Sequence, residues 1–182
     1  SKLYESMNEK ENFSKNLINY SPKMHNIFVN MQKFINKSTG NSTGKILIYS
    51  DYKNLGGTDA FEQVLIANGY ERYDHKSNPI DNLIKTDNRK KRYTFITGDA
   101  NENKEINKNA FNVEQNKEGE FIQVMMISES GAEGISLTCV RQVHILNPYW
   151  NNVRIDQVFG RAIRRNSHNQ LDERDRNVEQ YL

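Results

Sequence analysis

A glutamine, a glycine and two arginines recur at fixed spacing near the carboxyl end of the sequence. Gln157, Gly160, Arg161 and Arg164 gather on one side of a helix predicted over 152–165, because each residue turns a helix by about 100°. Two guanidinium groups one turn apart can clamp a multiply charged anion such as a phosphate group. The Gln157 amide is suited to orienting a water molecule. This polar stripe is the strongest candidate for chemistry in the chain.

A plainer explanation of the stripe is a solvated basic face, which is the usual origin of paired arginines on a helix. The glycine at a fixed offset argues against it. Gly160 costs about 1 kcal/mol relative to alanine in a helix interior, so its presence favours the close approach of another surface. The opposite side of the helix is apolar and is expected to face the protein core; it carries Ile155, Val158, Phe159, Ala162 and Ile163.

The elements that must position this helix follow from the hydrophobic pattern. Apolar runs bounded by turn residues predict buried strands at 45–50, 92–97, 121–128 and 141–146, and a last strand at 178–182. Helical patterns are predicted at 22–36, 56–68 and 99–116, and the polar stretch 70–91 is expected to be an irregular surface excursion. Strands that alternate with helices predict an α/β fold, a mostly parallel sheet with helices on both faces.

Ligands of such sheets bind at the carboxyl ends of the strands. The predicted ends are Ser50, Thr97-Gly98, Ser128 and Asn147. A glycine pair, Gly56-Gly57, follows the first of these ends and opens a helix. Helix amino termini can hold a phosphate of a nucleic acid, but tight-turn geometry explains the two glycines equally well.

The composition limits the class of protein. The formal net charge of the 182 residues is +2, which permits contact with phosphate without requiring it. The single cysteine, Cys139, excludes a disulfide within the chain and favours an intracellular setting. No apolar run reaches the roughly 20 residues that a membrane span needs, so we expect no membrane partner. The histidines and Cys139 show no metal-ligand spacing, so we expect no metal site in this chain.

The spacing Gln157-x-x-Gly160-Arg161-x-x-Arg164 resembles motif VI of superfamily 2 helicases and translocases. The stretch Ser128-Glu-Ser-Gly-Ala-Glu-Gly-Ile-Ser-Leu137 resembles motif V, especially its form in Swi/Snf-type ATPases. The residues from Arg161 to His168 are similar to those of helicase-type ATPases of large nucleocytoplasmic DNA viruses, the poxvirus nucleoside triphosphatase I and early transcription factor helicase type.

The resemblance implies that 21–182 form the C-terminal RecA-like lobe of a larger protein, and that 1–20 form a linker or helical extension. A missing N-terminal lobe would hold most of the ATP and Mg²⁺. In this family Arg161 and Arg164 would be arginine fingers on the γ-phosphate, and Gln157 would approach the phosphate and the attacking water. These three are the catalytic candidates.

The resemblance also implies binding residues. Gly134, Ser136 and Gly160 would lie near the nucleotide, although Ser136 stands where Swi/Snf-type ATPases have Asn and many helicases have Asp. The backbone of DNA or RNA would be contacted by residues at the strand ends and the glycine turn: Ser50, Gly56, Gly57, Thr97, Gly98 and Ser128. Further implied partners are the N-terminal lobe and a viral transcription machinery. The implied setting is viral transcription or genome processing, in the virion and the host cytoplasm.

Two other functions fit parts of the sequence. A helicase-like lobe without catalysis could serve as a docking module for nucleic acid or protein, but the intact Gln, Gly, Arg and Arg set argues against such decay. A free-standing nucleotide-dependent enzyme would need a P-loop or G-x-G-x-x-G after its first strand, and the sequence contains neither. The stretch 39–46 only approximates a P-loop and precedes a strand. We therefore expect the isolated chain to be inactive.

Overall fold

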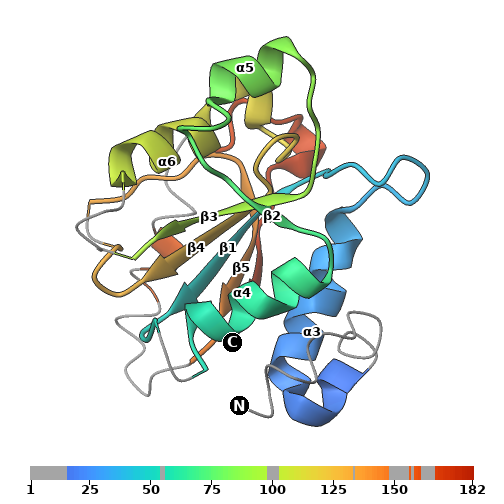
Figure 1. Cartoon of the computed structure of the whole chain (residues 1–182), viewed down its shortest axis with the longest axis vertical. Coiled ribbons are helices and arrows are strands. Elements are labelled where there is room, and N and C mark those ends of the chain that lie inside the picture. The colour runs from blue at the N-terminus through green and yellow to red at the C-terminus, as the bar shows by residue number, and fades with distance from the viewer. Residues whose placement is uncertain are drawn as a thin grey trace.

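The computed structural model describes residues 16–53, 56–97, 103–132, 134–147, 156, 158–160 and 167–182. Within these residues, six strands form one sheet in the order β2-β3-β4-β1-β5-β6 (Figure 1). The strands are β1 (Lys45–Ser50), β2 (Glu71–Arg72), β3 (Arg92–Ile96), β4 (Val124–Ser128), β5 (Val140–Ile145) and β6 (Glu179–Tyr181). Neighbouring strands all run parallel, and parallel neighbours require crossover connections of the kind that helices provide.

Helices cover both faces of this sheet. The described helices are α3 (Pro22–Met31), α4 (Thr58–Ala67), α5 (Ile80–Lys85) and α6 (Lys104–Asn112), with 3₁₀ turns η1 (Gln32–Phe34), η2 (Glu114–Asn116) and η3 (Glu173–Asp175). Ile46 and Ile48 of β1 pack in one core cluster with residues of α3 and α4. Leu47 and Tyr49 pack in the other cluster with residues of α5 and α6. The predicted parallel α/β fold is therefore confirmed.

Local sequence signals explain several element boundaries. The Ser21 hydroxyl accepts a 3.3 Å hydrogen bond from the Met24 N–H and caps α3, and Pro22 occupies the first turn, where a backbone donor is not needed. Helix α4 ends just before Gly69, whose φ of 82° lies in the left-handed region that stops helices. All six residues of β1 are buried, as expected for a central parallel strand.

The structure differs from the predictions at four places. The helix predicted to reach residue 116 ends as α6 at Asn112, where Val113 adopts an extended conformation before η2. The helix predicted to reach residue 36 ends as α3 at Met31 and continues as η1. The strand predicted from residue 121 begins at Val124, because the Asn116 side-chain oxygen accepts hydrogen bonds of 2.9 Å from the N–H groups of Phe121 and Ile122. The excursion at 70–91 contains β2 and α5. Both are short, and β2 is exposed, so neither leaves a periodic apolar pattern.

The amino-terminal extension and the helix that carries the motif VI resemblance are described only in part. Residues 1–15 lie outside the described residues, whereas 16–20 are helical. Leu17 from this helix is buried in the core cluster that contains α3 and α4, so the end of the predicted linker packs on the domain. Of the helix predicted over 152–165, residues 156 and 158–160 are described, and they are helical.

Candidate functional site

The predicted ligand-binding edge is built from the ends of four adjacent strands. These strands lie side by side in the order β3, β4, β1 and β5. Strands β4 and β1 end in Ser128 and Ser50, whereas Thr97 directly follows β3 and Asn147 is the second residue after β5. Ser50 and Ser128 are register partners across the β1–β4 ladder. The topology therefore brings together four residues that are far apart in the sequence.

Hydroxyl groups at this edge bond to neighbouring strand ends. The Ser50 hydroxyl donates a 2.6 Å hydrogen bond to the Asn147 side-chain oxygen. The Ser128 hydroxyl donates a 2.8 Å hydrogen bond to the Thr97 carbonyl. Ser50 is fully buried and Ser128 is 4% exposed. Both predicted nucleic-acid residues thus hold the edge together in this structure instead of presenting their hydroxyls to solvent.

The loop after β4, which carries the motif V resemblance, lies tightly against the end of β3. The Ser130 hydroxyl also donates to the Thr97 carbonyl and lies 3.0 Å from the Ser128 hydroxyl. A Cβ atom on Gly131 would lie 1.9 Å from the Ile96 carbonyl oxygen, so no larger residue fits there without movement. Sequence reasoning passed over Ser130 and Gly131. The alternation of Ser and Gly after a strand was the signal that could have marked them.

Farther along this loop are two of the three residues predicted to lie near the nucleotide. Gly134 is exposed, has a φ of 68° and has open space where a Cβ would stand. The Ser136 carbonyl accepts a 2.8 Å hydrogen bond from the Asn112 side chain at the end of α6. The same side chain accepts a 3.0 Å bond from the Thr138 N–H. Asn112 therefore fixes the loop beyond Gly134 and leaves the glycine accessible.

The glycine turn before α4 has a steric explanation. A Cβ on Gly57 would lie 1.9 Å from the Tyr52 carbonyl oxygen, and Gly56 has a φ of 90°. The first backbone donors of the helix are already bonded. The Thr58 N–H donates to the Tyr52 carbonyl over 3.2 Å, and the Asp59 N–H donates to the Lys53 carbonyl over 2.9 Å. A phosphate at these donors would have to displace the loop carbonyls, so turn geometry accounts for the glycines in this conformation.

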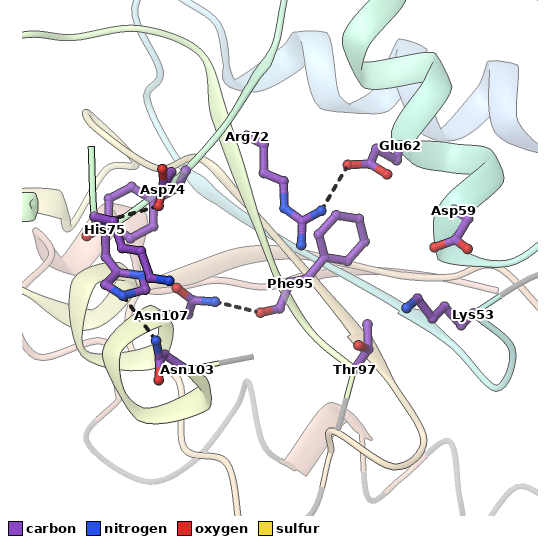
Figure 2. A pocket seen from close by; sticks show the side chains of 12 residues that line it. Lys53, Asp59, Glu62, Arg72, Asp74, His75, Phe95, Thr97, Asn103 and Asn107 are labelled. Carbon is purple, nitrogen blue, oxygen red and sulfur yellow. Dashed lines mark hydrogen bonds and ion pairs between the residues drawn. The ribbon is translucent and has the colours of Figure 1, made fainter. Parts of the chain in front are cut away.

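An open pocket of about 560 Å³ lies beside this turn, between α4, the end of β3 and α6 (Figure 2). Thr97 and the start of α6 line it, and its charged lining is balanced between three basic and three acidic side chains: Lys53, Arg72, Lys76, Asp59, Glu62 and Asp74. A pocket with both donors and acceptors suits a ligand that has both, such as a ribose-phosphate backbone, whose phosphates accept and whose 2′-hydroxyls can also donate. Three of these six charged residues, Arg72, Asp74 and Lys76, belong to the 70–91 excursion, in which no functional residue was predicted.

Contacts inside the pocket hold its side chains in place. The Arg72 guanidinium lies 4.8 Å from the Phe95 ring centre and 3.8 Å from a Glu62 carboxylate oxygen. The Asn107 amide donates a 3.1 Å hydrogen bond to the Phe95 carbonyl, and a His75 ring nitrogen lies 3.0 Å from the Asn103 amide nitrogen (Figure 2). Hydrogen bonding from Ser77 lowers the pKa of Asp74, so this carboxylate is ionised at neutral pH.

The described turn of the helix that carries the motif VI resemblance has its apolar side inward. Val158 is 4% exposed and belongs to a core cluster, against which Phe159 packs. Gly160 is exposed, with open space around it. The predicted catalytic residues Gln157, Arg161 and Arg164, and the predicted nucleic-acid residue Gly98, lie outside the described residues.

A comparison with protein families decides what kind of domain this is. The model of the helicase conserved C-terminal domain matches residues 26–166, most of the chain. The chain belongs to the helicase C-terminal domain family. No described helix is long and apolar enough to cross a membrane. Within the described residues, His, Cys, Asp and Glu side chains nowhere gather in a group of three or more that could hold a metal ion.

Relatives of this helicase domain include viral proteins. A putative ATP-dependent RNA helicase of Acanthamoeba polyphaga mimivirus is 31% identical over 173 residues, which are 94% of this chain and 27% of the relative. A termination factor NPH-I homolog of African swine fever virus is 40% identical over 92 residues, which are 50% of this chain and 13% of the relative. The chain thus spans about a quarter or less of these relatives. The C-terminal part of the Fun30 ATPase domain superposes with a TM-score of 0.49 at 17% identity, over 98% of this chain and 48% of that one.

Proposed function

We propose that this chain is the second RecA-like lobe, spanning residues 21–182, of a nucleic-acid-dependent ATPase that acts as a helicase or translocase. In this proposal Arg161 and Arg164 reach ATP bound on the N-terminal lobe of the same protein. That lobe supplies most of the contacts to ATP and Mg²⁺, while Gly134, Ser136 and Gly160 approach the nucleotide from this side. Membership in the helicase family and similarity to a viral protein named as an ATP-dependent RNA helicase support the proposal.

The observation that carries the proposal is the orientation of one helical turn. Val158 is buried in the core, whereas Gly160 is exposed. Residues at 157, 161 and 164 share the side of an ideal helix on which Gly160 lies. On the helix predicted over 152–165, the two arginines are therefore expected to face away from the domain's own core. They are then available to neutralise the charge that develops on a transferring phosphoryl group, with Gln157 placed to orient the attacking water.

The nucleic-acid track would follow the pocket beside Thr97 and the glycine turn. Lys53 and Lys76 supply positive charge there, and the nearby carboxylates and amides can accept or position hydroxyl groups. Contacts of this kind recognise the backbone, so we expect weak sequence preference and affinity that falls as salt rises. The viral relatives support a role in viral transcription or genome processing inside the infected cell.

The test is ATP turnover by the full-length protein with and without single-stranded DNA or RNA. Arg161→Ala and Arg164→Ala should each lower nucleic-acid-stimulated turnover by about 10³-fold or more, the typical contribution of an arginine finger. Arg174→Ala is the matched control, because Arg174 is exposed on η3 and loses the same charge. Nucleic-acid binding by a wild-type protein that shows no turnover would instead favour the docking module.

A further inference from the structure

The Ser50 hydroxyl lies where two functional segments meet. It is fully buried, donates to the Asn147 side-chain oxygen over 2.6 Å and accepts a 3.2 Å hydrogen bond from the Tyr52 N–H. One hydroxyl therefore bonds both to the loop that leads into α4 and to the second residue after β5. A short hydrogen bond from a buried hydroxyl is costly to leave unmade, so the two segments keep a defined relative position.

On one side, the Ser50 hydroxyl contacts the loop beside the candidate nucleic-acid pocket. The Tyr52 carbonyl accepts from the Thr58 N–H at the start of α4. A Cβ on Gly57 would lie 3.0 Å from the Ser50 hydroxyl as well as against the Tyr52 carbonyl, so the turn is packed directly on this group. Lys53 and Asp59 of the same turn line the pocket. A ligand that shifts the turn must disturb the bonds of Ser50.

On the other side the hydroxyl holds the start of the segment that leads to the proposed arginine fingers. Asn147 follows β5, whose end is fixed to β1 by a 2.8 Å hydrogen bond from the Leu146 N–H to the Tyr49 carbonyl. Gln157 lies ten positions after Asn147 in the sequence. The Asn147 side chain is therefore the point at which the central strand β1 contacts the beginning of this segment through a side-chain hydrogen bond.

We propose that Ser50 and Asn147 are a positioning pair that transmits nucleic-acid occupancy of the pocket lined by Lys53 and Asp59 to the segment that follows Asn147 and carries the motif VI resemblance. This inference rests on the proposed function and adds to it a regulatory connection between the two ligands. It assigns Ser50 a role in coupling, not in contact with the nucleic-acid backbone. Coupling between two sites typically changes affinity or response by about 5- to 150-fold.

The experiment measures ATP turnover by the full-length protein with and without single-stranded nucleic acid. Asn147→Ala should lower the stimulation ratio by about fivefold or more, at the low end of typical coupling, while turnover without nucleic acid changes by less than about twofold. Asn147→Asp keeps the acceptor oxygen and should restore most of the stimulation. Ser50→Ala should lower the ratio as Asn147→Ala does, and the double variant should lose no more than either single variant.

Several outcomes would overturn the coupling role of Ser50 and Asn147. Unchanged stimulation in Asn147→Ala would show that the hydrogen bond carries no coupling. Equal losses of stimulated and unstimulated turnover, with a lowered melting temperature in Asn147→Ala, would show a purely structural role. Other outcomes would contradict the proposed function itself: a wild-type protein whose turnover is not stimulated by nucleic acid, or full turnover in Arg161→Ala. In either case the coupling role of Ser50 and Asn147 is contradicted as well.

Discussion

The Ser128 hydroxyl at the end of β4 donates a 2.8 Å hydrogen bond to the Thr97 carbonyl, which directly follows β3. The Ser130 hydroxyl donates to the same carbonyl. One backbone oxygen thus joins the loop with the motif V resemblance to the neighbouring strand. Because Ser128 is buried, this arrangement is part of the framework of the proposed nucleic-acid edge.

Ser128→Ala should lower the free energy of unfolding by about 1 kcal/mol, the usual net contribution of such a bond. The cost stays modest because Ser130 still satisfies the Thr97 carbonyl. Urea unfolding of the wild-type chain, both single variants and Ser128→Ala/Ser130→Ala checks this. The double variant should lose more than the sum of the single variants, since only it leaves the carbonyl without a hydroxyl donor; strict additivity would contradict the shared role.

Gly131→Ala should destabilise the chain by about 1–3 kcal/mol, the usual cost of forcing atoms into a packed site. The added Cβ would stand 1.9 Å from the Ile96 carbonyl oxygen. Gly160→Ala is the matched control, because its Cβ meets open space on a helix and should stabilise the chain by up to about 1 kcal/mol. Urea unfolding gives both values, and equal effects of the two changes would contradict the described packing of the loop.

The imidazole of His144 should make stability depend on acidic pH. Burial lowers the pKa of His144 to about 4, with the Glu179 carboxylate opposing and the Lys33 ammonium adding to that shift. Between about pH 6.5 and 4 the unfolded chain binds a proton that the folded chain does not, so stability falls as pH falls through this window. From pH 7.5 to 5 the loss from this group is about 2 kcal/mol.

His144→Phe tests this, because a phenyl ring can keep the parallel stacking on Tyr181, whose ring centre lies 4.7 Å away. The measurement is the free energy of unfolding at pH 7.5 and pH 5. The variant should show a smaller loss than the wild type by about 2 kcal/mol. An identical pH dependence in both proteins would contradict a buried neutral imidazole.

The ammonium group of Lys45 should make the free energy of unfolding depend on pH at neutral to basic values. Its ammonium nitrogen is buried, donates to the Phe111 carbonyl over 2.8 Å, and burial lowers the pKa of Lys45 to about 7 against the attraction of Cys139 and Glu120. Between about pH 7 and 10.5 the unfolded chain holds a proton that the folded chain has released, so stability rises with pH.

The measurement is the free energy of unfolding of the wild-type chain and of Lys45→Met at pH 7 and pH 9. The wild type should gain about 2 kcal/mol more than the variant over this interval. A gain of equal size in both proteins would show that Lys45 stays charged in the folded chain. Lys45→Met keeps the apolar length of the side chain and so limits the loss of packing.

The sequence was sufficient for elements whose pattern depends on burial or on helix termini. Strand β1 consists of a buried apolar run, and α4 lies between Gly57 and Gly69, so both were located closely. By contrast, β2 is a pair of exposed residues that is defined only by its ladder with β3. Such a strand is stabilised by a partner that is distant in the sequence, so the local residue pattern does not predict it.

The same distinction applies to the candidate site. Strand ends could be predicted because parallel strands expose their carboxyl ends at one edge, and Ser50, Thr97, Ser128 and Asn147 do meet there. Which hydroxyl bonds to which strand could not be predicted, because it depends on register and side-chain orientation. The requirement for Gly131 likewise arises from the Ile96 carbonyl, 35 residues earlier in the sequence.

The most direct test of the central claim is single-turnover ATP cleavage by the full-length protein bound to nucleic acid. Single-turnover rates separate chemistry from product release, and a parallel titration measures nucleotide affinity. We predict that Arg161→Ala and Arg164→Ala each slow cleavage by about 10³-fold or more, while Arg174→Ala cleaves at the wild-type rate. Wild-type cleavage rates in both finger variants would contradict the assignment of this helix to the ATP site.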